Sequence, residues 1–139
     1  MILRVANESD IPGMRMVRSS VHENVLSDPA RIAASDYIDI LESLGRTWVI
    51  ESEGEVVAFA SAYSTGSFWA LFVHPDHEGK GYGSTLHSIT VEWLWSLGHS
   101  QLWLTTGAGT RAENFYISKG WQSSGSIADG ELRFVLNKT

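Results

Sequence analysis

The chain has 139 residues, of which 43% are hydrophobic and 19% are charged, a balance that predicts one folded domain over residues 1–139 and argues against disorder. Its formal net charge is -6 and it has no basic block, so we expect no nucleic-acid partner. Because it has no cysteine, it can form neither a disulfide nor a thiolate metal site. No apolar run approaches the roughly 20 residues that cross a bilayer, so we expect no membrane partner and a cytoplasmic location.

The first third of the chain predicts one strand and two helices. Alternating residues predict a strand over 2–6, and the pattern that follows predicts a helix from about Ile11 to Val25. The stretch "SDPA" (27–30) is a second helix start, and this helix ends at Gly45. Its apolar face consists of Ile32, Tyr37, Ile40, Leu41 and Leu44.

From residue 46 onward the hydrophobic period changes from that of a helix to that of a strand. Residues 46–52 and 55–64 are rich in valine and aromatics, and Glu53 and Gly54 between them predict a tight hairpin turn. A further turn leads into a strand over 68–74. We therefore expect three antiparallel strands in succession.

The remainder of the chain predicts a helix over 82–97, a strand over 101–106, a helix over 110–120, and a final hairpin of 121–127 with 131–136. Taken together, the elements predict a mixed α/β fold. Its sheet is mostly antiparallel, with about seven strands and four helices.

The most specific stretch is "VHPDHEGKGYGST" (73–85), in which glycines lie where a strand becomes a helix. A helix start carries unpaired N–H donors and the positive end of the helix dipole, so this turn can bind a phosphate. The spacing fits neither the Walker loop nor the dinucleotide fingerprint, whose last glycine is replaced by Ser84. The alternative is that the glycines only permit a sharp turn.

This stretch resembles motif A of the GNAT superfamily, the acetyl-CoA-dependent N-acyltransferases, at Val73, Pro75, Gly81 and Gly83. The later stretch "TRAENFYISKGW" (110–121) resembles motif B of that family. Its matching residues are Ala112, Phe115, Tyr116, Gly120 and Trp121. The similarity extends over roughly residues 46–136 and implies the GNAT fold, a single N-acetyltransferase domain, and acetyl-CoA as co-substrate without a metal.

The resemblance implies that main-chain N–H groups hold the pyrophosphate of CoA and that the strand before motif A pairs with the pantetheine arm. The implied cofactor-binding residues are Leu71, Phe72, Val73, Gly79, Lys80, Gly81, Tyr82, Gly83, Ser84, Ala112 and Phe115. Two positions depart from the family pattern. Glu78 replaces the usual Arg or Gln, and Gly109 replaces a frequent Asn. We expect the Glu78 side chain to point outward into water.

Acyl transfer to an amine requires a general acid for the departing thiolate and a base for the ammonium. The resemblance implies that Tyr116 is the acid, and the alternative is that it is only a packed aromatic. The strand glutamate that serves many relatives as the base is replaced here by Trp69 or Ala70. His22, Glu23 and Glu51 remain as alternatives, and none is assigned as the base.

We expect an N-acetyltransferase that acts on a primary amine of a small molecule or peptide. The alternative is a non-catalytic acyl-CoA-binding module that acts as a sensor or partner subunit. The acidic balance favours a cationic acceptor, and a homodimer is a further expectation from the family. Possible acceptor contacts on the first two predicted helices are Glu23, Asp36, Tyr37 and Asp39.

Overall fold

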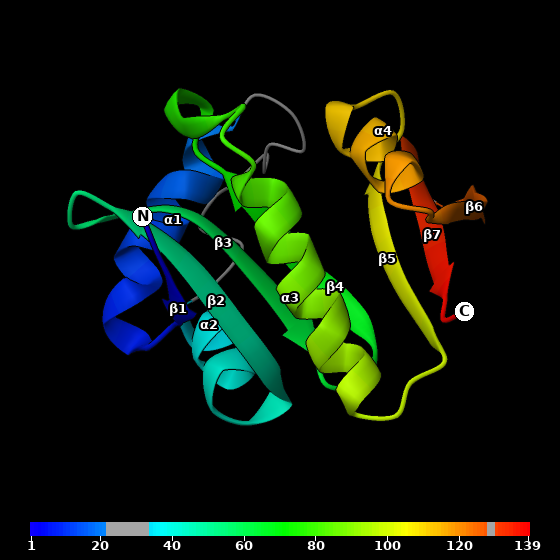
Figure 1. The fold of residues 1–139 in the computed structure, drawn as a ribbon, viewed down its shortest axis with the longest axis horizontal. Helices are drawn as coiled ribbons and strands as arrows, with labels where there is room; N and C mark the ends of the chain where they lie inside the picture. Colours follow the sequence, from blue (N-terminus) through cyan, green and yellow to red (C-terminus); the bar gives the residue numbers. More distant parts are fainter. Residues whose placement is uncertain (22–33, 128–129) are drawn as a thin grey trace.

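The computed structural model describes residues 1–21, 34–127 and 130–139, and within these ranges it contains seven strands and four α-helices (Figure 1). The strands are β1 (Ile2–Val5), β2 (Gly45–Ser52), β3 (Glu55–Tyr63), β4 (Ser67–Val73), β5 (Gln101–Gly107), β6 (Gln122–Ser126) and β7 (Glu131–Asn137). The helices are α1 (Ile11–Ser20), α2 (Ala34–Asp39), α3 (Tyr82–Ser96) and α4 (Arg111–Ser118). Three short helical turns are η1 (Glu8–Asp10), η3 (Ile40–Leu44) and η4 (Pro75–His77).

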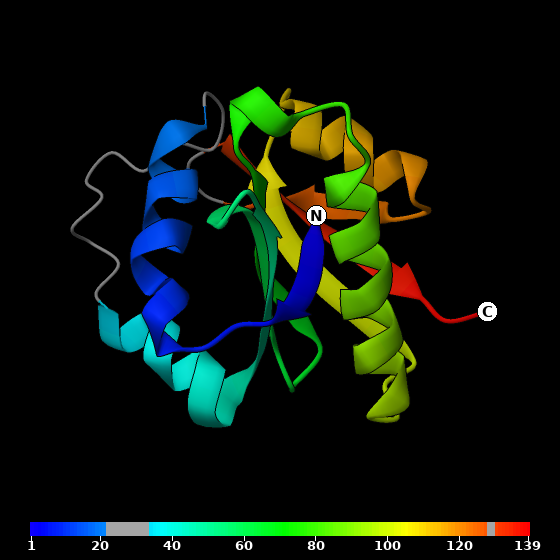
Figure 2. The same cartoon turned by 60° about the vertical axis from the view of Figure 1, so that its left-hand side comes forward.

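The seven strands form one sheet in the order β1-β2-β3-β4-β5-β7-β6. Every neighbouring pair is antiparallel except β4 and β5, which are parallel. Figure 2 shows α1 and α2 on one face of the sheet and α3 and α4 on the other. The mixed α/β fold expected from the sequence is confirmed.

The side chains of the central strands alternate between the two helical layers, as the strand period requires. Val49 on β2 and Phe59 on β3 pack in the cluster with α1, where Met14 is fully buried. Trp48 and Ile50, which lie on either side of Val49 in β2, pack on the opposite face with Leu86 of α3. Because β2 and β3 are covered on both faces, their sequences read as nearly continuous apolar runs.

The element boundaries differ from the predicted ones mainly at helix ends. The first helix ends at Ser20, because Val21 has extended backbone angles, and not near Val25. The second continues from α2 into the π-helical turn η3, which leaves Leu44 exposed. Leu97, the last residue of the helix expected over 82–97, lies just beyond the end of α3 and is also exposed.

The predicted start of the second helix at 27–30 and its residue Ile32 lie outside the described ranges, as does most of the last hairpin turn. Among the helices that are described, none combines the length and the apolarity needed to span a membrane.

Candidate functional site

The strands β4 and β5 are paired at only one end, and this opens the sheet. Ser67 is opposite Trp103, and the Trp103 N–H donates to the Gly66 carbonyl at 3.1 Å. Beyond this point the two strands diverge toward α4 (Figure 1). The β4 edge over residues 71–73 therefore has no strand neighbour on its β5 side within the described structure.

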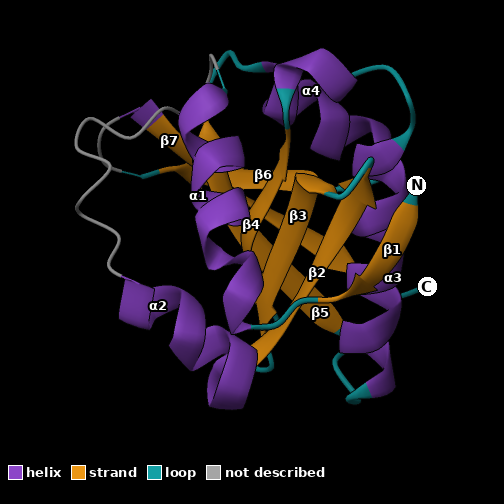
Figure 3. Ribbon diagram, turned by 90° about the vertical axis from the view of Figure 1, so that its left-hand side faces the viewer, coloured by secondary structure: helices purple, strands orange, loops and turns teal. Residues whose placement is uncertain are grey.

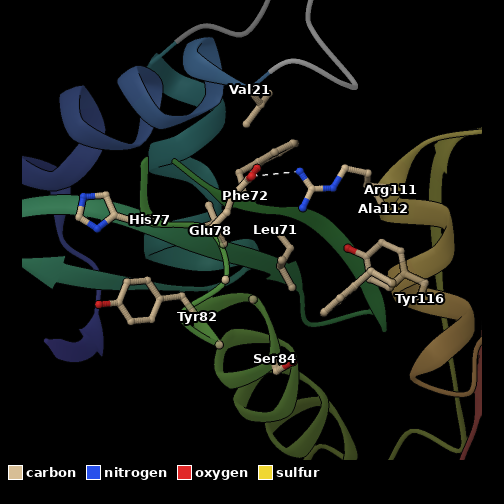
Figure 4. A pocket seen from close by; sticks show the side chains of 15 residues that line it. Val21, Leu71, Phe72, His77, Glu78, Tyr82, Ser84, Arg111, Ala112 and Tyr116 are labelled. Carbon is tan, nitrogen blue, oxygen red and sulfur yellow. Dashed lines mark hydrogen bonds and ion pairs between the residues drawn. The ribbon is translucent and has the colours of Figure 1, made fainter. Parts of the chain in front are cut away.

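A cavity of about 590 Å³ lies where the strands diverge (Figure 4). Its volume is in the range of sites for small molecules and cofactors. The described lining comes from the end of β4, the turn before α3, the first turn of α3, and α4, with Val21 at the margin. These residues are Val21, Leu71, Phe72, Val73, His77, Glu78, Gly79, Gly81, Tyr82, Gly83, Ser84, Arg111, Ala112, Phe115 and Tyr116.

The glycine turn presents the start of α3 to this cavity. Gly79 and Gly81 have φ angles of 77° and 82°, a left-handed conformation that side chains disfavour, and a Cβ at either would meet no atom within 4 Å. The first helical bond runs from the Thr85 N–H to the Gly81 carbonyl, and no side chain caps the helix. The N–H groups of residues 82–84 thus lack helical acceptors beside an open space. A phosphate fits this arrangement of donors and helix dipole.

Glu78 does not lie where the sequence predicted. Its carboxylate lines the cavity and accepts a hydrogen bond from the Arg111 guanidinium at 3.0 Å (Figure 4). Glu78 is exposed to water as expected, with 41% of its side chain accessible, but its direction differs from the expectation because the carboxylate faces Arg111 at the cavity. The difference arises because Arg111, 33 residues later, supplies an opposite charge that local sequence does not show.

Tyr116 lies at the end of the cavity near β5, on α4. Its side chain is only 7% exposed and packs in an aromatic cluster with Phe68 and Trp121. Its hydroxyl is directed toward the cavity (Figure 4), and no hydrogen bond from it to another described residue is present. Burial raises the pKa of Tyr116 well above its usual value, so the phenol stays protonated at neutral pH. The residue is both a packed aromatic and a proton donor that faces the cavity.

Phe115 and Gly83 form a close contact between α4 and α3. A Cβ on Gly83 would lie 3.7 Å from Phe115 and 3.8 Å from Val73, which is ordinary van der Waals distance. Because Gly83 has no side chain, Phe115 of α4 can lie close to the start of α3 at this point of the cavity wall.

A buried histidine supports the Tyr116 cluster from α3. The Trp121 indole N–H donates to His87 Nε2 at 2.9 Å, so this nitrogen carries no proton. Burial, together with the positive charge of Lys119, lowers the pKa of His87 to about 4. His87 is therefore neutral at physiological pH and does not line the cavity.

The predicted binders of the cofactor are brought together with one exception. Lys80 is not among the described residues that line the cavity, and its ammonium lies 3.2 Å from His77 Nδ1. No group of three or more potential metal ligands occurs within the described part of the chain.

The candidate bases are not assembled at the cavity. Glu51 accepts a hydrogen bond from Arg4 at 3.1 Å and does not line it. His22 and Glu23 lie outside the described residues. Trp69 of β4 packs edge-on against Tyr37.

The suggested acceptor contacts on the second helix also lie elsewhere. Tyr37 is 3% exposed and belongs to the core between α1 and the sheet, and Asp36 and Asp39 are exposed away from the cavity lining. Glu23, the fourth of these contacts, is likewise outside the described ranges.

Two arginines near the cavity were not singled out from the sequence. Arg111 directly precedes Ala112 in the second motif, and its position at a helix start beside the motif was an available signal. Arg18 follows Ile11 and Met14 at helical spacing, so it is a charged residue on the apolar face of a predicted helix. Arg18 stacks on Phe72 of the cavity wall.

Comparison with known proteins gives consistent results. Residues 14–121 match the family model described as the acetyltransferase (GNAT) family. Among curated protein sequences, none matches this chain significantly.

Solved structures with similar folds cover nearly the whole chain. A GCN5-related N-acetyltransferase from Rhodopseudomonas palustris superposes with a TM-score of 0.80 at 19% identity, covering 99% of this chain and 95% of that one. The ribosomal-protein-alanine N-acetyltransferase from Brucella melitensis gives 0.73 at 19% identity, with coverages of 99% and 100%. The protein yncA from Salmonella typhimurium, solved with its cofactor acetyl-CoA, gives 0.75 at 18% identity, with coverages of 99% and 93%.

Proposed function

Because this chain belongs to the GNAT acetyltransferase family, we propose that it transfers an acetyl group from acetyl-CoA to a primary amine of a small molecule or peptide, with Tyr116 as the general acid. The observation that carries the proposal is the composition of the cavity. It combines the uncapped start of α3, the unpaired edge of β4, and the Tyr116 hydroxyl in one space of about 590 Å³. Each of these is suited to a different part of a CoA thioester.

The turn before α3 would hold the diphosphate of CoA. The N–H groups of residues 82–84 lack helical acceptors, and the glycine conformation at Gly79 and Gly81 keeps side chains away from the anion. Arg111 is the only arginine or lysine among the described residues of the lining, so it is the side chain best placed to neutralise a phosphate.

The β4 edge would orient the pantetheine arm and the reacting carbonyl. Acetyl-CoA supplies an acetyl thioester, which an amine attacks. Backbone N–H groups near Leu71 to Val73 would align the amide groups of the arm and stabilise the oxyanion that forms. The parallel strand β5 cannot occupy this edge, because the two strands have already diverged.

Tyr116 would give its proton to the departing thiolate. Its phenol stays protonated because burial raises its pKa, and it faces the cavity without a described hydrogen-bond partner. The ammonium of the acceptor first loses a proton to solvent or to a base, and the neutral amine then attacks the thioester carbonyl. The departing thiolate takes the proton of Tyr116, which regains one from solvent.

The names of the structural neighbours support an amine as acceptor. The Brucella melitensis protein is named a ribosomal-protein-alanine N-acetyltransferase, which implies an amine of a protein as its acceptor. At 19% identity this supports the fold and the type of reaction that we propose.

A second function is favoured by one specific observation. Glu78 is the only carboxylate among the described residues that line the cavity, and it is paired with Arg111. A cavity with no carboxylate available as a base would suit a module that binds acyl-CoA without turnover.

Two measurements separate these functions. Calorimetry with CoA tests binding, and release of free thiol from acetyl-CoA in the presence of a panel of amines tests transfer. We expect micromolar CoA binding together with amine-dependent thiol release. Binding without amine-dependent release from any member of the panel would support the non-catalytic module.

A further inference from the structure

Arg18 lies behind the wall of the cavity, against Phe72, and does not itself line the cavity. Its guanidinium carbon is 4.0 Å from the centroid of the Phe72 ring, and Phe72 lines the cavity. Val21, three residues later and directly after the end of α1, also lines the cavity (Figure 4). Figure 3 shows α1 lying across one face of the sheet, and Phe72 of β4 packs against the cluster that α1 forms there. The guanidinium is thus beside the margin that Val21 and Phe72 form.

The charge of Arg18 is not matched by its described surroundings. Its Nη1 atom is inaccessible to water and has no hydrogen-bond partner, and no described carboxylate lies within ion-pair distance. Burial lowers the pKa of Arg18, and the more distant Glu131 carboxylate partly opposes this shift. Stacking on Phe72 occupies the flat face of the guanidinium and leaves the Nη1 donor at its edge unpaired.

A partly buried charge with an inaccessible, unpaired donor atom is costly to a folded protein unless something pairs with it in the functional state. We propose that Arg18 binds a carboxylate of the acyl acceptor, so that the acceptor is an amino-acid-like amine that carries a carboxylate near its amino group. The planar fork of a guanidinium matches both oxygens of a carboxylate. The inference rests on the proposed acetyl transfer, and it names the class of acceptor.

The acceptor expected from the net charge of -6 was a cation, and Arg18 changes that expectation. Charges across the surface act through water and are screened over about 8 Å at physiological salt. A guanidinium beside the site acts at short range and in a lower effective dielectric. A zwitterion is attracted by both sets of charges. Its ammonium is attracted by the net negative charge of the protein, and its carboxylate is attracted by Arg18.

The test compares amino acids with the amines that remain when their carboxylates are removed. Each pair, such as L-leucine with 3-methylbutylamine and L-lysine with cadaverine, is assayed for acetyl-CoA-dependent thiol release. The full chain is used as wild type, as Arg18→Met and as Arg18→Lys. Arg15→Met is the matched control, because it removes one positive charge from the same helix while its guanidinium faces Tyr37 at 5.8 Å.

We expect wild type to prefer the acid member of at least one pair by thirtyfold or more in kcat/KM. Arg18→Met should reduce this preference at least tenfold, mainly through KM, and Arg18→Lys should retain part of it because the charge remains without the fork. Arg15→Met should retain the preference within threefold. A wild-type preference for the amine member throughout the panel, or an unchanged preference in Arg18→Met, would overturn the assignment.

Binding without turnover separates this inference from the proposed reaction. Saturation-transfer NMR with CoA-loaded protein reports which amino acids bind, whether or not they are acetylated. Carboxylates that bind wild type and not Arg18→Met would support the Arg18 site even if no amine were acetylated, in which case only the reaction would fail. No bound carboxylate in wild type, or equal binding to both proteins, would overturn the Arg18 proposal even if amines were acetylated.

Discussion

The Arg111 guanidinium donates a hydrogen bond to the Glu78 carboxylate at 3.0 Å, and this ion pair joins the first residue of α4 to the turn before α3. Both residues line the cavity between these elements. The side chains are 76% and 41% exposed, so the pair itself stabilises the fold by at most about 1 kcal/mol. Its larger effect concerns the cofactor, because the same cation cannot be fully available to a carboxylate and to a phosphate.

Glu78→Gln should therefore tighten CoA binding about threefold to tenfold, since it releases Arg111 to pair with a phosphate. The gain should shrink at high salt. Arg111→Gln should weaken binding, and in that background Glu78→Gln should change the affinity by less than twofold. Calorimetry on the four proteins gives the coupling. Equal gains with and without Arg111 would show that Glu78 acts only by direct repulsion of the cofactor.

Tyr116→Phe should lower turnover about tenfold to a hundredfold while leaving CoA affinity within a few-fold, as expected when a positioned acid is removed. The fold should tolerate this change, because the hydroxyl makes no hydrogen bond to a described residue. Steady-state kinetics and thermal unfolding would be measured on the same preparations. Wild-type turnover in the variant would leave Tyr116 with a packing role alone.

Gly83→Val should weaken CoA binding at least tenfold, whereas Gly83→Ala should stay within about threefold of wild type. An alanine Cβ would sit 3.7 Å from Phe115, but the two methyl groups of valine extend further and would press on Phe115 or narrow the cavity. CoA titration of both variants tests this, with circular dichroism as the control for folding. Similar losses in both variants would indicate that any Cβ at this position obstructs the phosphates.

His87 should make stability depend on pH. Its pKa is about 4 in the folded chain and about 6.5 in the unfolded chain, so the unfolded state binds more protons between these values. The stabilisation is present in full above pH 6.5 and is lost as the pH falls toward 4. Between pH 7 and 4.5 the loss from this residue is about 2 to 3 kcal/mol.

His87→Gln isolates that contribution. The glutamine amide oxygen can still accept the Trp121 indole hydrogen bond, and it does not titrate. Urea unfolding at pH 7 and 4.5 should show a smaller pH effect in the variant, while carboxylates such as Asp10 contribute equally to both proteins. Parallel pH dependences in the two proteins would show that His87 is not protonated on unfolding in this range.

Much of the fold was predictable because its signals are local. The hairpin at Glu53 and Gly54 follows from adjacent residues, and both have positive φ angles as such a turn requires. The helix from Tyr82 follows from apolar spacing, and the glycines before it fix where the strand becomes a helix. The resemblance to motifs A and B of the GNAT family predicted that Gly83 and Tyr116 lie in one site. Both residues line the cavity in the structure.

The sequence by itself determined the elements, the glycine turn and the motif residues, since each depends on neighbours within a few positions. The tertiary structure decided which other side chains those residues contact. Glu78 and Arg111 are 33 positions apart, and they can pair because α3 and β5 lead the chain back to the end of the sheet where Glu78 lies. The divergence of β4 from β5 and the burial of Arg18 against Phe72 likewise depend on how separate elements pack. Charge and burial are properties of the space around a side chain, and that space is filled by residues distant in the sequence.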